Sequence, residues 1–225
     1  MLGKRKKTHP EPHHVPMAVL GGGILWFGWF GFNAGSALAM NGVAVSAFLA
    51  TNTAAAAGAI GFATCEWIIH KKPTVLGTVS GAIAGLVAIT PGCGYVTPLS
   101  SLFIGLVGGT LSFFAIVFLK SKLGYDDTLD VFGCHGVAGI WGTLAVGIFA
   151  TKSVNPASAN GLLYGNFGLL KVQFIAVLAC VLYAAVATFV ILKVISLFVK
   201  LRTDKAEESS GLDISLHGET AYNDF

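Results

Sequence analysis

Charged side chains are scarce in this sequence and absent from four long stretches of it. Asp, Glu, Lys and Arg make up 11% of the 225 residues, whereas a soluble domain has about 25%. None of the four occurs between Glu11 and Glu66, between Lys72 and Lys120, between Asp130 and Lys152, or between Lys171 and Lys193. A soluble fold could not solvate uncharged stretches of this length, so the composition excludes an ordinary soluble globular domain.

The uncharged stretches predict helices that cross a membrane. A helix needs roughly 20 apolar residues to cross the hydrocarbon, so the first two stretches can hold two crossings each and the last two can hold one each. Turn residues such as Asn41-Gly42 and Pro91-Gly92 separate the crossings. The expected spans are about 16–40, 43–69, 73–90, 97–119, 130–150 and 169–201. We therefore expect an all-α membrane protein, a polytopic bundle of about six transmembrane helices.

Lysine and arginine are distributed unevenly between the two sides of this predicted bundle. Segments 1–15, 70–72, 120–129 and 200–225 would share one side and hold eleven of these residues, whereas the opposite side holds only Lys152 and Lys171. Positive residues prefer the cytoplasmic side, so we expect both ends of the chain to be cytoplasmic. The predicted organisation is a basic leader (1–15), a transmembrane domain (16–201) and a cytoplasmic tail (202–225), in the plasma membrane of the cell.

Motifs for catalysis or metal binding are missing from the sequence. The four cysteines are scattered without CxxC spacing, and there is no phosphate-binding glycine loop, HExxH motif or nucleophile elbow. We expect no enzyme activity, no cofactor, no metal site and no nucleic-acid partner.

His135 is the most informative residue, because it lies inside a predicted span. An ionisable side chain within a membrane helix usually faces a cavity or a partner. Helical spacing places Val131 and His135 on one face that is otherwise apolar. The imidazole could exchange a hydrogen bond with a small polar solute, and a buried histidine that ties helices together is the alternative.

A second candidate feature is a stripe in the first span. Leu25, Trp29, Phe32 and Ser36 are spaced by four, three and four residues and so share one helix face. Aromatic faces attract cations by ~0.5–2 kcal/mol, and a serine hydroxyl accepts hydrogen bonds from N–H donors. A simple packing stripe is the alternative, and spacing alone favours it.

Four segments resemble the Amt/Mep/Rh family of ammonium transporters. Residues 28–36 (GWFGFNAGS) resemble the sixth helix of the family, and residues 81–94 (GAIAGLVAITPGCG) resemble its eighth helix and outer turn. Residues 126–136 (DDTLDVFGCHG) resemble the start of the tenth helix, and residues 211–222 (GLDISLHGETAY) resemble the cytoplasmic tail. The resemblance covers nearly the whole chain in the same order.

The resemblance implies transport of ammonium or ammonia through a narrow apolar pore. It implies that Ser36 belongs to an outer ammonium site and that Phe32 belongs to a pore gate. It also implies that Leu25, Trp29 and Val131 line the lumen and that His135 is one of two histidines in mid-pore. A homotrimer and a PII-type signalling protein at the cytoplasmic face are the partners it implies.

One departure from the family is large. Family members have about eleven spans in two inverted repeats, and this chain resembles only the second repeat followed by a long final helix. We therefore expect a truncated or split form, inactive without its missing N-terminal half. An ammonium sensor that signals through the tail is the alternative function. A membrane enzyme that uses His135 is disfavoured, because only cysteine and small residues flank it.

Overall fold

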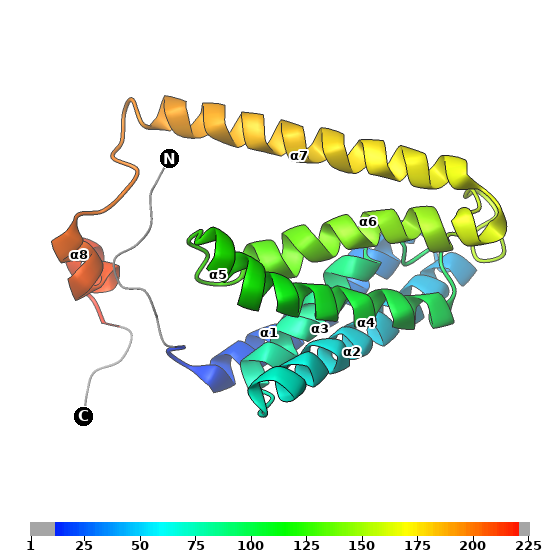
Figure 1. Ribbon diagram of the computed structural model, residues 1–225, viewed down its shortest axis with the longest axis horizontal. Coiled ribbons are helices and arrows are strands. Elements are labelled where there is room, and N and C mark those ends of the chain that lie inside the picture. The colour runs from blue at the N-terminus through cyan, green and yellow to red at the C-terminus, as the bar shows by residue number, and fades with distance from the viewer. Residues whose placement is uncertain (1–11, 221–225) are drawn as a thin grey trace. The chain divides into compact units, whose positions relative to one another are not determined.

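The computed structural model describes residues 12–220, which contain helices and no strands (Figure 1). The leader residues 1–11, with their basic cluster, and the last residues, 221–225, lie outside this range. The α-helices are α1 (Val15–Ala34), α2 (Gly42–His70), α3 (Val75–Ile89), α4 (Pro98–Phe114), α5 (Lys120–Leu123), α6 (Ala138–Phe149), α7 (Phe167–Ile195) and α8 (Lys205–Ser210). The π-helical segments are η2 (Ala115–Leu119), η3 (Phe132–Val137) and η5 (Asp213–His217), and the short 3₁₀ turns are η1 (Gly35–Ala37) and η4 (Leu162–Tyr164).

Five helical runs within residues 12–220 are long and apolar enough to cross a membrane. They are Val15–Ala37, Gly42–His70, Pro98–Leu123, Phe132–Phe149 and Phe167–Ile195. The remaining expected span corresponds to α3, an apolar helix of 15 residues, which covers about 22 Å at about 1.5 Å per residue. It is shorter than expected because Thr74 caps its start and a turn begins at Thr90. The expected all-α polytopic bundle is confirmed.

Side-chain caps fix where three of these helices begin. Asn41, Thr74 and Thr97 each precede a helix, and each side-chain oxygen accepts a hydrogen bond from the backbone N–H three residues later. A cap satisfies a backbone donor that has no partner inside the helix. These caps, rather than the hydrophobic pattern, therefore set the N-terminal boundaries.

Helices α2, α3 and α4 approach one another at backbone distance. A Cβ atom added at Gly85 or at Gly105 would lie 2.2 Å from the carbonyl oxygen of Ala54, and one added at Gly109 would lie 2.1 Å from that of Gly58. Small residues permit this approach, which supplies van der Waals packing where there is no hydrophobic drive between helices. Gly31, in contrast, has nothing within 4 Å of an added Cβ.

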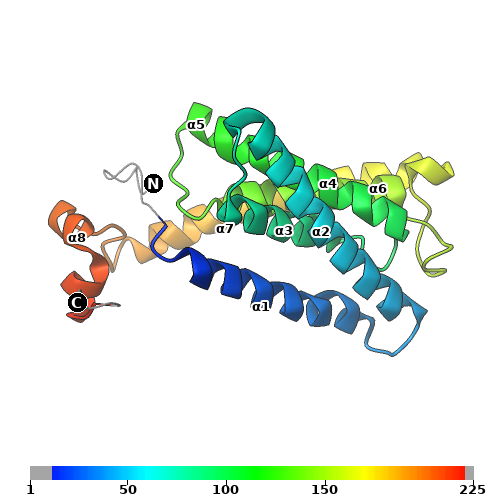
Figure 2. The ribbon, with the colours of Figure 1, turned by 90° about the horizontal axis from the view of Figure 1, so that it is seen from below.

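The unit formed by residues 12–179 has two ends with different loops. The turn 90–97 and the loop 150–166 lie at one end, where the backbone N–H of Thr151 donates to the Tyr95 carbonyl oxygen at 2.8 Å. The α1–α2 turn lies at this end too, and the segments 70–74 and 120–131 lie at the other (Figure 2). Helix α1 packs on α2 and α3 at the edge of the unit.

Residues 180–220 belong to a separate unit, whose boundary falls within α7. Its helix α8 begins with a capping box, in which the Asp204 and Glu207 side chains accept from each other's backbone N–H groups. Arg202 also pairs with Glu208 at 3.0 Å. The described part of the tail is therefore locally ordered by polar contacts.

The glycine contacts generate a stability prediction. We expect Gly109→Ala to destabilise the folded chain by about 1–3 kcal/mol, the usual range for an overpacked site, because the added methyl group would overlap the Gly58 backbone. Gly31→Ala is the matched control, since its methyl group would meet no atom. Thermal unfolding in detergent measures both, and equal midpoints for the two variants would refute the packing account.

Candidate solute-binding site

The stripe on α1 occupies a face that the rest of its unit leaves open. Leu25 is 43% exposed and Phe32 is 62% exposed, Ser36 is also exposed, and Trp29 is half-buried. The rings of Trp29 and Phe32 meet edge to face with centroids 5.7 Å apart. Leu25, Phe32 and Ser36 thus lie outside the buried core, and Trp29 connects the exposed Phe32 ring to the interior of the unit.

Trp29 is held by the end of α3. Its indole Nε1 donates a hydrogen bond to Thr90 Oγ1 at 2.8 Å, and the Thr90 hydroxyl donates to the Leu86 carbonyl oxygen at 2.7 Å. Because the hydroxyl proton is used by Leu86, Thr90 serves Trp29 only as an acceptor. The indole N–H is therefore already satisfied, and the ring presents its apolar surface.

The end of the stripe at Phe32 and Ser36 opens into a cavity of about 540 Å³. Its walls come from the end of α1, the start of α2, the turn 90–95 and Asn155. Phe32 and Ser36 line it, together with Thr90 and Tyr95. Ser36 Oγ donates to the Phe32 carbonyl oxygen at 2.5 Å, so its lone pairs remain for an N–H donor. The lining combines polar and apolar side chains and carries no formal charge.

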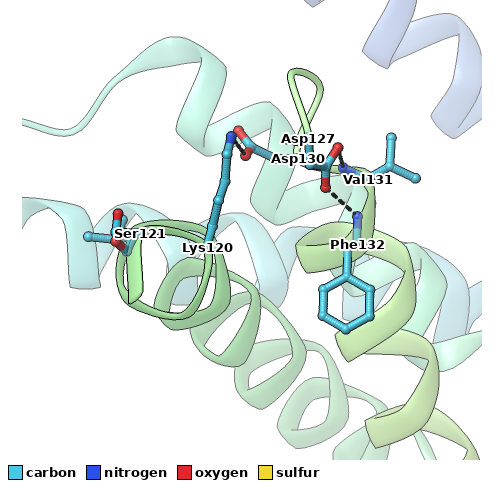
Figure 3. Close-up of polar contacts among 7 residues, drawn as sticks. Lys120, Ser121, Asp127, Asp130, Val131 and Phe132 are labelled. Atoms are coloured by element: carbon cyan, nitrogen blue, oxygen red, sulfur yellow. Dashed lines mark hydrogen bonds and ion pairs between the residues drawn. The ribbon is translucent and has the colours of Figure 1, made fainter. Parts of the chain in front are cut away.

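His135 lies in the π-helical segment η3, which leads into α6. The Asp127 carboxylate accepts hydrogen bonds from the backbone N–H groups of Val131 at 3.0 Å and Phe132 at 2.8 Å (Figure 3). Asp130, the neighbouring acidic residue, does not take part in this cap. Its backbone is left-handed (φ 55°), and its carboxylate binds Lys120 Nζ at 2.6 Å instead.

Helix α4 and segment η2 pack against segment η3 and hold it in place. The buried Ser112 hydroxyl donates to the Gly133 carbonyl oxygen at 2.9 Å. A Cβ at Gly133 would lie 2.5 Å from Ile116 Cγ1, so no larger residue fits there. His135 is exposed, and Val131, one turn earlier, is 49% exposed. π-Helical turns of this kind are frequent at functional sites.

Helix α3 packs against both of the elements that carry the candidate residues. It contacts α1 and η3, whereas the backbones of α1 and η3 do not approach each other closely within the unit 12–179. The structure therefore unites Leu25, Trp29, Phe32 and Ser36 as one group, and it keeps Val131 and His135 as a second. Both groups are open surfaces and do not enclose a lumen within the described residues.

Two groups outside the membrane-spanning segments have shifted acidity. Burial raises the pKa of the Cys93 thiol, and hydrogen bonds from the backbone oppose this only partly. Burial also raises the pKa of Tyr125, helped by the negative charges of Asp127 and Asp130 and opposed by Lys120. Neither residue was singled out by the sequence as a functional group, since no motif marks them.

Five apolar helices long enough to cross a bilayer, with an exposed aromatic stripe and an exposed histidine, define a polytopic α-helical membrane protein. The sequence model of the Ammonium Transporter Family matches residues 1–222. The chain belongs to this family, which is a class of transporters rather than of enzymes, and the expected resemblance is confirmed.

Individual relatives agree with the family assignment. The ammonium transporter of Bacillus subtilis is 56% identical over 225 residues, which are 100% of this chain and 56% of that protein. The ammonium transporter of Aquifex aeolicus is 49% identical over 223 residues, covering 99% and 52%. The crystal structure of Saccharomyces cerevisiae Mep2 matches with a TM-score of 0.84 and 36% identity, covering 92% and 50%. The chain thus spans about half the length of these relatives.

The Trp29–Thr90 contact generates a second prediction. We expect Thr90→Val to leave the indole N–H without its acceptor and to destabilise the chain by about 1–3 kcal/mol, the range for an unsatisfied polar group. Thr90→Ser keeps the acceptor and should behave as the parent chain. Unfolding midpoints, with fluorescence of a variant whose only tryptophan is Trp29, measure the effect. A normal Thr90→Val variant would show that the contact is dispensable.

The Cys93 thiol generates a prediction about pH. Because burial raises its pKa, the reactive thiolate fraction at pH 8 is lower than for an ordinary cysteine. In a variant with Cys65, Cys134 and Cys180 replaced by serine, alkylation should stay slow at pH 8 and accelerate only at higher pH. Ser36→Cys, on the exposed side of the same cavity and in a background without the native thiols, is the comparison. Equal rates and equal pH profiles would contradict the prediction.

Proposed function

We propose that this chain supplies one half of a pore that carries ammonium or ammonia across a membrane. The observation that supports this best is the exposure of His135 and of the α1 stripe on a unit of otherwise apolar helices. An exposed ionisable side chain within a span is unfavourable in lipid. A solute path beside it gives the imidazole a function and a polar neighbour.

The proposed roles follow the chemistry of each group. Ser36 accepts a hydrogen bond from the ion at the outer cavity, and the adjacent Phe32 ring attracts its charge and gates the entrance. Beyond them, Leu25, Trp29 and Val131 form an apolar lining in which a desolvated cation is strongly disfavoured. The ion therefore gives up its proton before this section, and His135 exchanges a hydrogen bond with the neutral species.

The open lining requires a second set of helices. This chain spans about half the length of its relatives, and both groups of lining residues are exposed. We propose that helices equivalent to the unmatched part of those relatives cover the stripe and complete the pore. We propose further that the completed units form a homotrimer in the plasma membrane.

The proposed orientation rests on charge. Lys71, Lys72, Lys120 and Lys122 lie at the end of the unit 12–179 opposite to Lys152, which favours a cytoplasmic position for that end. Residues 16–201 are then the transmembrane domain, and residues 202–225 form a cytoplasmic tail. The ordered helix α8 offers this tail as a docking element for a PII-type signalling protein.

A sensor function is the second candidate. One similar structure is named "Sensor Amt Protein", with a TM-score of 0.78 and 33% identity, covering 95% of this chain and 53% of that one. A sensor would bind ammonium in the same outer cavity and transmit occupancy through the tail with little flux. Measured flux separates this function from transport.

The proposed function predicts the outcome of a reconstitution experiment. We expect the chain alone in liposomes to take up no methylammonium beyond empty liposomes, and we expect uptake when the unmatched segment of the Bacillus subtilis relative is added. His135→Ala should lower this uptake by about tenfold or more, the effect of losing one hydrogen bond to a charged or desolvated solute.

His70→Ala is the matched control, because His70 is an exposed histidine at the end of α2 that belongs to neither group of lining residues. Uptake by the chain alone would contradict the proposal that a second set of helices is required to complete the pore. Absence of uptake in the assembled complex, together with retained ammonium binding, would favour the sensor.

A further inference from the structure

The outer cavity contains a buried amide to which none of the roles above assigns a task. Asn33 follows Phe32 on α1, is only 5% exposed and lines the cavity. A buried primary amide is unfavourable unless its donor and acceptor groups find partners. The partners of Asn33 therefore show what its remaining atoms are free to bind.

One side of the amide is fixed by α2. Asn33 Nδ2 donates a hydrogen bond to Thr51 Oγ1 at 2.9 Å. Thr51 is fully buried, and its hydroxyl donates to the Ala47 carbonyl oxygen at 2.6 Å. A hydroxyl has a single proton, so Thr51 serves Asn33 only as an acceptor. With the Thr51 proton on the Ala47 carbonyl oxygen, the amide nitrogen of Asn33 faces Thr51 and the amide oxygen lies on the other side of the amide group.

The amide oxygen of Asn33 is the group whose hydrogen-bonding capacity is not used. Asn33 Oδ1 has no hydrogen-bond partner within residues 12–220. It belongs to a residue of the cavity wall, next in sequence to Phe32 and one helical turn before Ser36. Ser36 is in a similar state, because its proton is used by the Phe32 carbonyl oxygen. Asn33 Oδ1 and Ser36 Oγ are therefore two neutral oxygen acceptors of a cavity wall that also includes the rings of Phe32 and Tyr95.

We propose that Asn33 Oδ1 is a further binding group for a small cation that carries N–H donors, and that Thr51 is the positioning residue that turns this oxygen toward the cavity. The inference rests on the proposed function and adds a second acceptor to Ser36. An ammonium-type ion loses water when it enters such a site, and each oxygen replaces one hydrogen bond to water. Two fixed acceptors therefore favour cations with N–H groups over cations that only an aromatic face could attract.

The test measures binding to the full chain in lipid nanodiscs with two probes, methylammonium and tetramethylammonium. Methylammonium has N–H donors, and tetramethylammonium has none but keeps the cation–π attraction. We expect Asn33→Ala to raise the methylammonium Kd about tenfold, the effect of losing one hydrogen bond to a charged group. The Kd of tetramethylammonium should not change. A site that has merely collapsed would lose both probes, and that result would overturn the inference.

Thr51 is tested with a matched pair of substitutions. Thr51→Val has nearly the same shape but no acceptor, so the amide loses its fixed orientation and the methylammonium Kd should rise. Thr51→Ser keeps the hydroxyl and should restore the parent Kd. Equal Kd values for Thr51→Val, Thr51→Ser and the parent chain would overturn the positioning role.

The outcomes distinguish this inference from the proposed function. Ser36→Ala probes the outer site without involving Asn33. If Ser36→Ala weakens methylammonium binding and Asn33→Ala does not, the inference fails and the proposed function stands. If the parent chain binds methylammonium no better than empty nanodiscs, the inference fails, and uptake by the assembled complex then decides the proposed function separately.

Discussion

The backbone contact among α2, α3 and α4 is the constraint on which the other features depend. Gly85 and Gly105 lie against the Ala54 backbone, and Gly109 lies against the Gly58 backbone. A side chain at any of these glycines would overlap the backbone atoms opposite it. Lipid tails solvate apolar side chains as well as protein does, so close packing has to supply the helix association that the hydrophobic effect supplies in water. This contact holds α3 in place, and α3 in turn packs against both α1 and η3, which carry the candidate side chains.

Hydroxyl groups that donate to carbonyl oxygens of their own helix orient several polar side chains in the unit 12–179. Thr51, Thr90 and Ser36 each donate to the carbonyl oxygen four residues earlier. Such back-bonding satisfies the proton inside the helix and leaves lone pairs that point outward. Asn33 and Trp29 are oriented by the first two of these acceptors. Neutral groups can thus be positioned as specifically as an ion pair, without the cost of burying charge.

The sequence predicted the helices well because charge is excluded from hydrocarbon over every span, and it predicted the α1 stripe because helical spacing is local. It could not predict the length of α3, which a cap at Thr74 decides. It could not show which of Asp127 and Asp130 caps η3, because the two aspartates are three residues apart, and the left-handed backbone of Asp130 distinguishes them only in the structure. The Asn33–Thr51 and Trp29–Thr90 contacts join residues 18 and 61 positions apart, and no periodicity encodes such pairs.

The exposed lining residues differ in what they indicate about the groups that cover them. Leu25 and Phe32 are as compatible with lipid as with another helix, because acyl chains are no more apolar than their side chains. His135 is different, since an imidazole in contact with hydrocarbon has no partner for its ring nitrogens. The π-helical turn holds it there nonetheless, fixed from behind by Ser112 and capped by Asp127. A backbone so constrained around one polar side chain agrees with our proposal that a further group of helices and a solute path lie on that side.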